Sequence, residues 1–199
     1  SNLHRQILHT MADLGSPKVE SAQTQLEALN PDVVVIPMQE SLESSNARRL
    51  IQDYDIVLDG SDNFPTRYLV NDACVLLDKP LVSGAAIHLR GQLMVIRPHK
   101  TACFRCLFPE PPKPEAIPSC QEAGVLGSAV GVIGTLMAHE AVKLALGVGD
   151  ALTNRLLVFE GMRSRFREVP VRRDDGCAVC GSTPTIRRLV SEGAACTVS

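Results

Sequence analysis

The ten residues Tyr54-Asp-Ile-Val-Leu-Asp-Gly-Ser-Asp-Asn63 decide the fold of this chain. Ile56, Val57 and Leu58 form a continuous apolar run, and polar residues follow it directly. Continuous rather than alternating apolarity is typical of a strand that is covered on both faces, as in a parallel sheet. Because strands and helices alternate along the chain, the sequence predicts an α/β protein with a Rossmann-like, mostly parallel sheet and flanking helices.

Hydrophobic periodicity and turn residues predict the elements on both sides of this strand. Ser16 as N-cap and Pro17 at the first helical position begin one helix, and Asn30 followed by Pro31 ends it. A long helix rich in small residues is expected over 124–146, buried in the core or in a dimer interface. The other expected helices cover residues 44–52 and 65–78, and the other expected strands cover residues 33–38, 80–86, 91–97, 156–160 and 166–171.

Composition excludes several classes of protein. With 45% apolar residues, 21% charged residues and a net charge of -2, the chain has an ordinary soluble, globular balance. The longest apolar candidate for a membrane span, 125–147, is interrupted by His139, Glu140 and Lys143. Because the chain has two Tyr, five Phe and no Trp, it lacks the aromatic residues that stack on bases. We expect a cytoplasmic protein that binds neither membranes nor, directly, nucleic acid.

Two C-x-x-C pairs, Cys103/Cys106 and Cys177/Cys180, indicate a metal site. Both sulfurs of such a pair can reach one ion, and two pairs supply the four thiolates of a closed tetrahedral zinc site. An odd cysteine count and the absence of a signal peptide disfavour disulfides. A redox C-x-x-C motif and unliganded thiols are the alternatives. Seven arginines near the second pair are typical of a solvated rim around a zinc knuckle, or of a site for an acidic protein or RNA.

Polar residues follow the apolar strand at the point where ligands bind in a doubly wound sheet, beyond the carboxyl ends of the strands. Asp62 is the carboxylate that we expect to hold Mg²⁺ against a triphosphate, in preference to Asp59, which lies closer to the strand. Asp62 or Asn63 could instead cap the helix that begins at Pro65. The two roles are compatible.

Two cationic side chains near the start of the chain are candidates for phosphate binding. Arg5 lies among several hydrogen-bonding side chains, and Lys18 lies in the first turn of a helix, where it is unfavourable for the helix dipole. Taken singly, each residue is typical of a surface charge. Their combination with the aspartates and the thiol pairs changes that interpretation.

Six motifs, in this order, resemble the MoeB/ThiF family, which is related to the enzymes that activate ubiquitin. The resemblance covers essentially the whole chain. The motifs are Ser1-Asn-Leu-His-Arg-Gln6, Gly15-Ser-Pro-Lys18, Leu58-Asp-Gly-Ser-Asp-Asn-Phe-Pro-Thr-Arg67, Cys103-Phe-Arg-Cys106, Cys120-Gln-Glu-Ala-Gly-Val-Leu-Gly127 and Cys177-Ala-Val-Cys180.

The resemblance implies an adenylyltransferase. Such an enzyme uses ATP to attach AMP to the C-terminal glycine of a ubiquitin-like sulfur-carrier protein of the MoaD/ThiS type, for sulfur transfer in molybdopterin, thiamine or tRNA-thiolation pathways. It further implies ATP, Mg²⁺ and Zn²⁺ as cofactors and a homodimer as the assembly.

The resemblance also implies roles for individual residues. Arg5 would lie on the ATP phosphates, Lys18 would bind phosphate, and Asp62, with Asn63 beside it, would bind magnesium. Ser1, Asn2, Leu3, His4 and Arg5 would line the ATP site, and Cys103, Cys106, Cys177 and Cys180 would be the zinc ligands.

Cys120 matches the position at which some family members have a cysteine that forms a thioester or a persulfide linkage with the carrier. A thiol just before a helix could have its pKa lowered by the helix N-terminus. Adenylation itself does not need a thiol, so a bystander role is the alternative.

The expected domain organisation is a single adenylation domain over 1–199 that lacks the N-terminal strand and the glycine-rich nucleotide loop of the family. Residues 1–100 would form the nucleotide-binding part and residues 101–199 the zinc-binding and carrier-docking part. The activity would then belong to the intact protein. Two other hypotheses stay open: a non-catalytic, zinc-stabilised module that binds a ubiquitin-like protein, and a thiol-redox protein.

Overall fold

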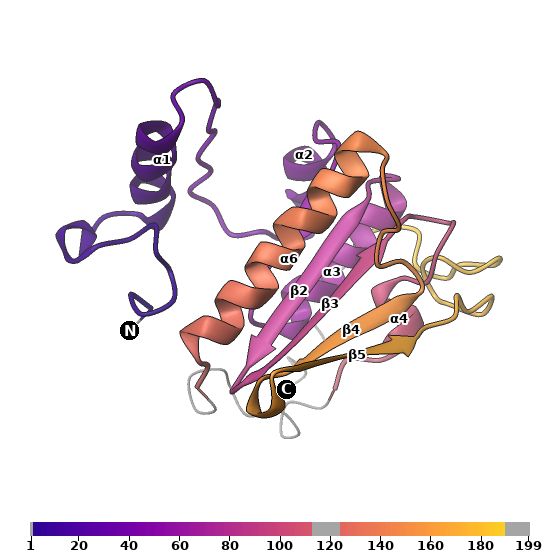
Figure 1. The fold of residues 1–199 in the computed structure, drawn as a ribbon. Helices are drawn as coiled ribbons and strands as arrows, with labels where there is room; N and C mark the ends of the chain where they lie inside the picture. Colours follow the sequence, from indigo (N-terminus) through magenta and orange to yellow (C-terminus); the bar gives the residue numbers. More distant parts are fainter. Residues whose placement is uncertain (1, 113–123, 190–199) are drawn as a thin grey trace, which may run out of the picture. The chain divides into compact units, whose positions relative to one another are not determined.

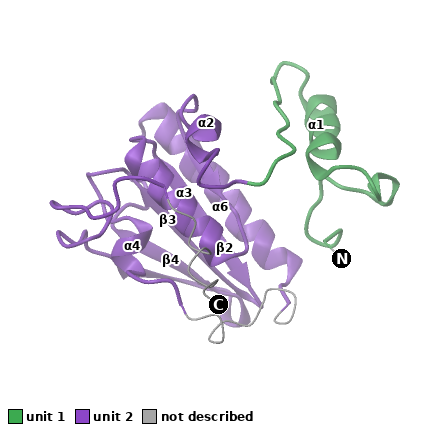
Figure 2. Ribbon diagram, turned by 180° about the vertical axis from the view of Figure 1, so that it is seen from behind, with its two compact units in different colours: residues 1–41 green, residues 42–199 purple. Residues whose placement is uncertain are grey.

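A computed structural model describes residues 2–112 and 124–189, which fall into two compact units, 1–41 and 42–199 (Figure 2). The first unit contains a 3₁₀ turn, η1 (Met11–Asp13), and helix α1 (Lys18–Leu29). Helix α1 begins one residue later than the sequence predicts, with Pro17 rather than Ser16 as its N-cap. The only buried residue of α1 is Ser21, which shares a hydrogen bond of 3.0 Å with His9.

The prediction of a strand over residues 33–38 is wrong. This segment forms no strand, and no part of the chain that the structure describes pairs with it. The side chains of Val34 and Ile36 are 84% and 62% exposed. A β-branched run favours a strand through its packing against neighbours on a sheet, and here the described residues provide no such neighbour.

The described residues of the second unit form a five-stranded sheet in the order β1-β2-β3-β4-β5, with helices on both faces (Figure 1). The strands are β1 (Val57–Asp59), β2 (Leu81–Ile87), β3 (Arg90–Ile96), β4 (Arg155–Glu160) and β5 (Arg165–Pro170). The helices are α2 (Ala47–Ile51), α3 (Phe64–Leu76), α4 (Phe104–Leu107) and α6 (Gly127–Leu146), and a 3₁₀ turn, η3 (Gly161–Arg163), connects β4 to β5.

The directions of the strands correct one expectation. The α/β class with flanking helices is confirmed, but the sheet is not mostly parallel. Among the described strands, β1 and β2 pair in parallel, and the pairs β2–β3, β3–β4 and β4–β5 are antiparallel. Two residues, His88 and Leu89, connect β2 to β3, and so short a connection can only reverse the chain. His88 has a φ of 52°, the left-handed conformation that such a tight turn uses.

Both faces of the central strands are covered. Along β3, Met94 and Ile96 belong to the core cluster that also contains residues of α2 and α3, whereas Leu93 and Val95 belong to the cluster that contains residues of α6. Figure 1 shows α6 in front of β2 and β3, and the reversed view in Figure 2 shows α3 on the opposite face. This two-sided burial explains the continuous apolar runs of the central strands. The expectation of a strand covered on both faces is wrong for β1, where the side chain of Leu58 is 47% exposed.

Helix α6 lies very close to the sheet because two strand positions have no side chain. A Cβ atom at Gly84 would lie 2.2 Å from Sδ of Met137, and one at Gly91 would lie 2.3 Å from Cγ1 of Ile133. Only glycine therefore fits at these positions without displacing the buried face of α6.

By length and composition alone, α6 is long and apolar enough to cross a membrane. In the structure it instead covers β2 and β3, and its buried face includes Glu140. The Glu140 carboxylate accepts hydrogen bonds from Nζ of Lys143 at 2.6 Å and from the backbone N–H of Leu152 at 2.9 Å. The backbone N–H of Leu152 and the contact of Nζ of Lys143 with the carbonyl of Asp150, at 2.7 Å, fix the C-terminal half of the helix to the following loop. Helix α6 therefore serves as a layer of the fold.

Candidate functional site

The loop between β1 and α3 presents the polar residues that the sequence analysis singled out. Asn63 is the N-cap of α3, and its side-chain oxygen accepts a hydrogen bond of 2.9 Å from the backbone N–H of Thr66. Asp62, one residue earlier, is exposed on the loop. Of the two capping candidates, Asn63 thus performs the capping role, and Asp62 is exposed to solvent.

Asp59 lies inside the fold at the end of β1 and is only 5% exposed. Its Oδ1 accepts a hydrogen bond of 2.9 Å from the backbone N–H of Ser61, which fixes the first turn of the loop. Its Oδ2 and the hydroxyl of Ser61 are buried, and neither has a hydrogen-bond partner in the described part of the chain. Asp59 therefore stabilises the start of the loop from inside the fold, whereas Asp62 is exposed.

Two residues near the start of the chain contact the side chain of Arg5 within the first unit. The guanidinium of Arg5 donates a hydrogen bond to the side-chain oxygen of Asn2, and a second guanidinium nitrogen lies 2.9 Å from Nε2 of His4. Leu3 is in the same turn, and Lys18 is the exposed first residue of α1. The first unit thus brings together Asn2, His4 and Arg5, while Ser1 lies outside the described residues.

The four cysteines of the two C-x-x-C pairs come together in the second unit. Their sulfur atoms all lie within 4.8 Å of one another. Individual Sγ–Sγ distances are 3.6 Å for Cys103–Cys177, 3.4 Å for Cys106–Cys180 and 3.9 Å for Cys103–Cys106. An ion with four thiolates at about 2.3 Å in a tetrahedron separates the sulfurs by about 3.8 Å. The cluster therefore has the size and the donor set of a closed four-thiolate metal site.

Contacts within the cluster shift the pKa values of its thiols in opposite directions. The hydrogen bond with Cys103, with a further contribution from the backbone N–H of Asp174, lowers the pKa of Cys106 to about 6. Hydrogen bonds within the cluster also lower the pKa of Cys177, and they raise that of Cys103. Because the thiolate is the form of cysteine that coordinates a metal, a cation bound here would displace the protons that these sulfurs share.

Buried polar contacts hold the first thiol pair against α3. Arg105, between Cys103 and Cys106, forms an ion pair with Asp72 of α3, with an N–O distance of 2.7 Å. On the other side, the backbone N–H of Ala102 donates to the side-chain oxygen of Asn154 at 2.8 Å. No pattern in the sequence assigns a role to Asp72, Arg105 or Asn154. The one available signal was the position of Arg105 inside a C-x-x-C motif.

Several of the arginines near the second thiol pair have acidic partners. Arg165 and Arg167 both contact Glu160, at 3.1 Å and 3.7 Å, and Arg173 contacts Asp175 at 3.5 Å. These carboxylates offset part of the positive charge. The arrangement agrees better with a solvated rim than with a site for an acidic partner.

The other cysteines differ in what the structure shows of them. Cys74 is fully buried in the core, and burial, with a smaller contribution from the nearby Asp59, raises its pKa to about 12. It is therefore an unreactive core thiol. Cys120, the residue expected to be reactive, lies outside the described residues.

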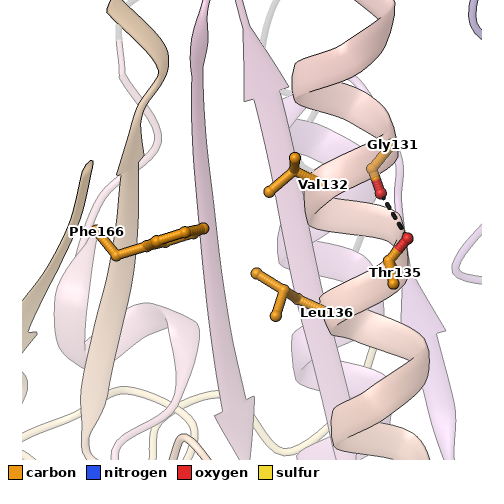
Figure 3. Close-up of a pocket in the computed structure, with 5 residues that line it drawn as sticks. All are labelled: Gly131, Val132, Thr135, Leu136 and Phe166. Atoms are coloured by element: carbon orange, nitrogen blue, oxygen red, sulfur yellow. Dashed lines mark hydrogen bonds between the residues drawn. The ribbon is translucent and has the colours of Figure 1, made fainter. Parts of the chain in front are cut away.

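A pocket of about 420 Å³ lies on the other face of the sheet, between α6 and β5. Val132 and Leu136 extend from α6 toward Phe166 of β5, and Thr135 donates a hydrogen bond of 2.9 Å to the carbonyl of Gly131 (Figure 3). Among the described residues, those that line the pocket have no titratable side chain. These residues can contact an apolar side chain, but they offer no group for acid, base or nucleophilic chemistry.

Comparisons with known proteins agree on one family. The ThiF family profile matches residues 1–179. The sulfur carrier protein adenylyltransferase of Thermus thermophilus is 52% identical over an alignment of 202 positions, which covers 98% of this chain and 74% of that protein. The adenylyltransferase and sulfurtransferase MOCS3 of Aedes aegypti is 48% identical over 191 residues, which cover 96% of this chain but 44% of that protein.

Solved structures show the same fold at lower identity. The crystal structure of E. coli MccB with ATP superposes with a TM-score of 0.78 at 22% identity and covers 90% of this chain and 55% of that one. This likeness concerns the fold alone. The chain thus spans about three quarters of the Thermus relative and about half or less of the Aedes and E. coli proteins.

Proposed function

The chain belongs to the ThiF family, and from that premise we propose that a protein carrying it adenylates the C-terminal glycine of a ubiquitin-like sulfur-carrier protein. The observation that carries the proposal is 52% identity, over nearly the whole chain, to a sulfur carrier protein adenylyltransferase. The exposed Asp62 on the loop between β1 and α3 supports it, because ligands of α/β sheets bind beyond the carboxyl ends of the strands.

The chemistry of adenylation explains why cations are needed. The carrier's terminal carboxylate attacks the α-phosphorus of ATP, a bond to AMP forms, and the bond to pyrophosphate breaks. The nucleophile is already ionised, so no protein general base is required. Two anions must nevertheless approach each other, and the charge that develops in the transition state is stabilised by cationic groups.

We assign the cationic roles to Arg5 and Lys18, which would contact the ATP phosphates. Asp62 would hold Mg²⁺, which when bound neutralises phosphate charge. Asn2, Leu3 and His4, with Ser1, would line the ATP site beside Arg5. The hydrogen bonds of Asn2 and His4 to Arg5 support this assignment, because they orient its guanidinium before a ligand arrives.

Both units would then belong to one adenylation domain, with a nucleotide-binding part in 1–100 and a zinc-binding, carrier-docking part in 101–199.

We infer that the four-thiolate site binds Zn²⁺ in a structural role. Four thiolates complete a tetrahedral coordination shell and leave no open position for water or substrate. Cys103, Cys177 and Cys180 are also buried, which keeps reactants away from the ion. The same closure argues against redox chemistry at the C-x-x-C pairs.

The partners and the pathway follow from the same premise. A sulfur carrier of the MoaD/ThiS type would be the protein substrate, and the product would serve molybdopterin, thiamine or tRNA-thiolation pathways. We expect a homodimer in the cytoplasm. Cys120 would act after adenylation, in a thioester or persulfide linkage with the carrier, because the first step does not need a thiol.

Carrier-dependent exchange of pyrophosphate into ATP tests the proposal. The full-length protein should catalyse exchange only with a carrier that ends in glycine. Asp62→Ala should abolish exchange, and Cys120→Ala should leave it unchanged. Asp32→Ala, which removes a carboxylate in an exposed turn of the first unit, is the matched control and should retain full activity. No exchange by a folded, zinc-loaded protein with any candidate carrier would favour a non-catalytic binding module.

A further inference from the structure

Helix α3 contacts both parts of the candidate site. At its N-terminus, Asn63 caps the helix, and the buried guanidinium of Arg67 donates a hydrogen bond to the carbonyl of Ser61 in the loop. Two turns further along, Tyr68, Asn71 and Asp72 face the segment that carries Cys103 and Cys106. One rigid element therefore supports the loop 59–63 and the first thiol pair.

The contact with the thiol pair is a buried, connected polar network. Nε of Arg105 lies 2.9 Å and 3.1 Å from the two carboxylate oxygens of Asp72, and a second guanidinium nitrogen lies 2.7 Å from Oδ2. The two side chains are only 6% and 7% exposed. The guanidinium also lies over the ring of Tyr68, 4.7 Å from its centre. This planar, two-pronged geometry fixes the direction of the arginine as well as its position.

A hydrogen bond also connects α3 to the segment between the thiols. The backbone N–H of Phe104 donates to the side-chain oxygen of Asn71 at 2.9 Å, and the amide nitrogen of Asn71 donates to Oδ1 of Asp72, also at 2.9 Å. Phe104 and Arg105 are the two residues between the thiols, on the four-residue helix α4. A displacement of either residue would move both Cys103 and Cys106.

We propose that Asp72 and Arg105 are positioning residues that hold the first thiol pair in its metal-binding geometry and, through α3, couple metal occupancy to the order of the loop 59–63. A buried charge without its partner is unfavourable, so the pair stays closed and keeps the thiols in place. In the other direction, a metal ion that fixes Cys103 and Cys106 fixes Arg105, and with it α3. The inference rests on the proposed function in one respect, namely that the loop 59–63 carries Asp62, the proposed Mg²⁺ ligand.

The test uses Asp72→Asn in the full-length, zinc-loaded protein. The first readout is the rate of zinc transfer to the chromogenic chelator 4-(2-pyridylazo)resorcinol, which should rise by about tenfold or more, as expected when a residue that orients a metal ligand is changed. The second is amide hydrogen exchange over 59–67, which should become several-fold faster. Excess Zn²⁺ should restore the slow exchange, which it would not do if the variant had only lost packing.

Two further variants sharpen the result. Arg105→Lys keeps the charge but lacks the two-pronged guanidinium, so its zinc transfer rate should fall between those of the wild type and Asp72→Asn. Glu168→Gln removes the carboxylate that lies 3.2 Å from Arg155 in an exposed ion pair between β5 and β4. This matched control should change neither readout.

Zinc transfer at the wild-type rate in Asp72→Asn would overturn the positioning role. Faster transfer with unchanged exchange over 59–67 would overturn the coupling. If Asp72→Asn does not fold, the wild-type protein decides: removal of zinc must speed exchange over 59–67 more than over β4 and β5, and an equal or absent effect contradicts the proposal. Because neither readout involves ATP or a carrier, failure here is separate from failure of the adenylation proposal.

Discussion

Removal of the proposed zinc ion should destabilise the protein by an amount that follows from the spacing of the thiols. The ion would join the two thiol pairs across 74 positions of sequence. A cross-link lowers the conformational entropy of the unfolded chain. For a loop of that length, this raises the free energy of the unfolded state by about 4 to 5 kcal/mol at 25 °C. A protein of this size changes its Tm by roughly 2–4 °C per kcal/mol, so the metal-free protein should melt roughly 9–18 °C lower.

The assay is thermal unfolding followed by circular dichroism, with and without a chelator, on protein whose zinc content has been measured. The double variant Cys177→Ser/Cys180→Ser should melt at the temperature of the chelated wild type and should not respond to chelator. Cys74→Ser is the matched control, because Cys74 is buried outside the cluster, and it should keep the full response to chelator. A Tm that falls by less than roughly 2 °C after proven loss of the metal would refute the account of the site as a structural cross-link.

Three further predictions concern the framework of the site. Gly91→Ala would place a Cβ 2.3 Å from Ile133, so the free energy of unfolding should fall by about 1–3 kcal/mol in urea titrations, whereas Gly134→Ala, with open space around it, should raise it by about 0.5–1 kcal/mol. Asn63→Ala removes the cap of α3 and should lower the same free energy by about 1 kcal/mol. Burial raises the pKa of the Cys74 thiol from about 9 to about 12. Below pH 9 the thiol is neutral in both the folded and the unfolded state and favours folding. This contribution is lost as the pH rises toward 12. Urea midpoints between pH 8 and about 11 should therefore fall more steeply for the wild type than for Cys74→Ala, and parallel curves would contradict this.

Local patterns predict much of this fold, because they depend on neighbouring residues. The continuous run at Ile56–Leu58 predicts β1, and the apolar face of residues 65–78 predicts α3, each within two residues of its bounds. The directions of β3, β4 and β5 depend on which strands pair, and residues far apart in sequence decide that. Residues 33–38 show the same limit, since a favourable local sequence forms no strand where the described residues offer no partner.

In the candidate site, too, local spacing predicts some features, and contacts between distant residues determine the others. Spacing within each C-x-x-C pair predicts that two sulfurs can share an ion, and the structure brings both pairs together. The support from Asp72 and Asn154 could not be predicted, because their contacts with residues 102–105 cross 33 and 52 positions of sequence. A hydrogen bond or an ion pair at that distance leaves no periodic signal in the sequence.

The central claim is that a protein carrying this chain transfers AMP to a sulfur carrier, and intact mass spectrometry of the carrier tests it most directly. After incubation with ATP and Mg²⁺, a carrier that ends in glycine should gain the mass of one adenylyl group, and Asp62→Ala should prevent this gain. A carrier that binds the folded, zinc-loaded protein and yet never gains that mass, even with pyrophosphatase present to remove the second product, would contradict the claim.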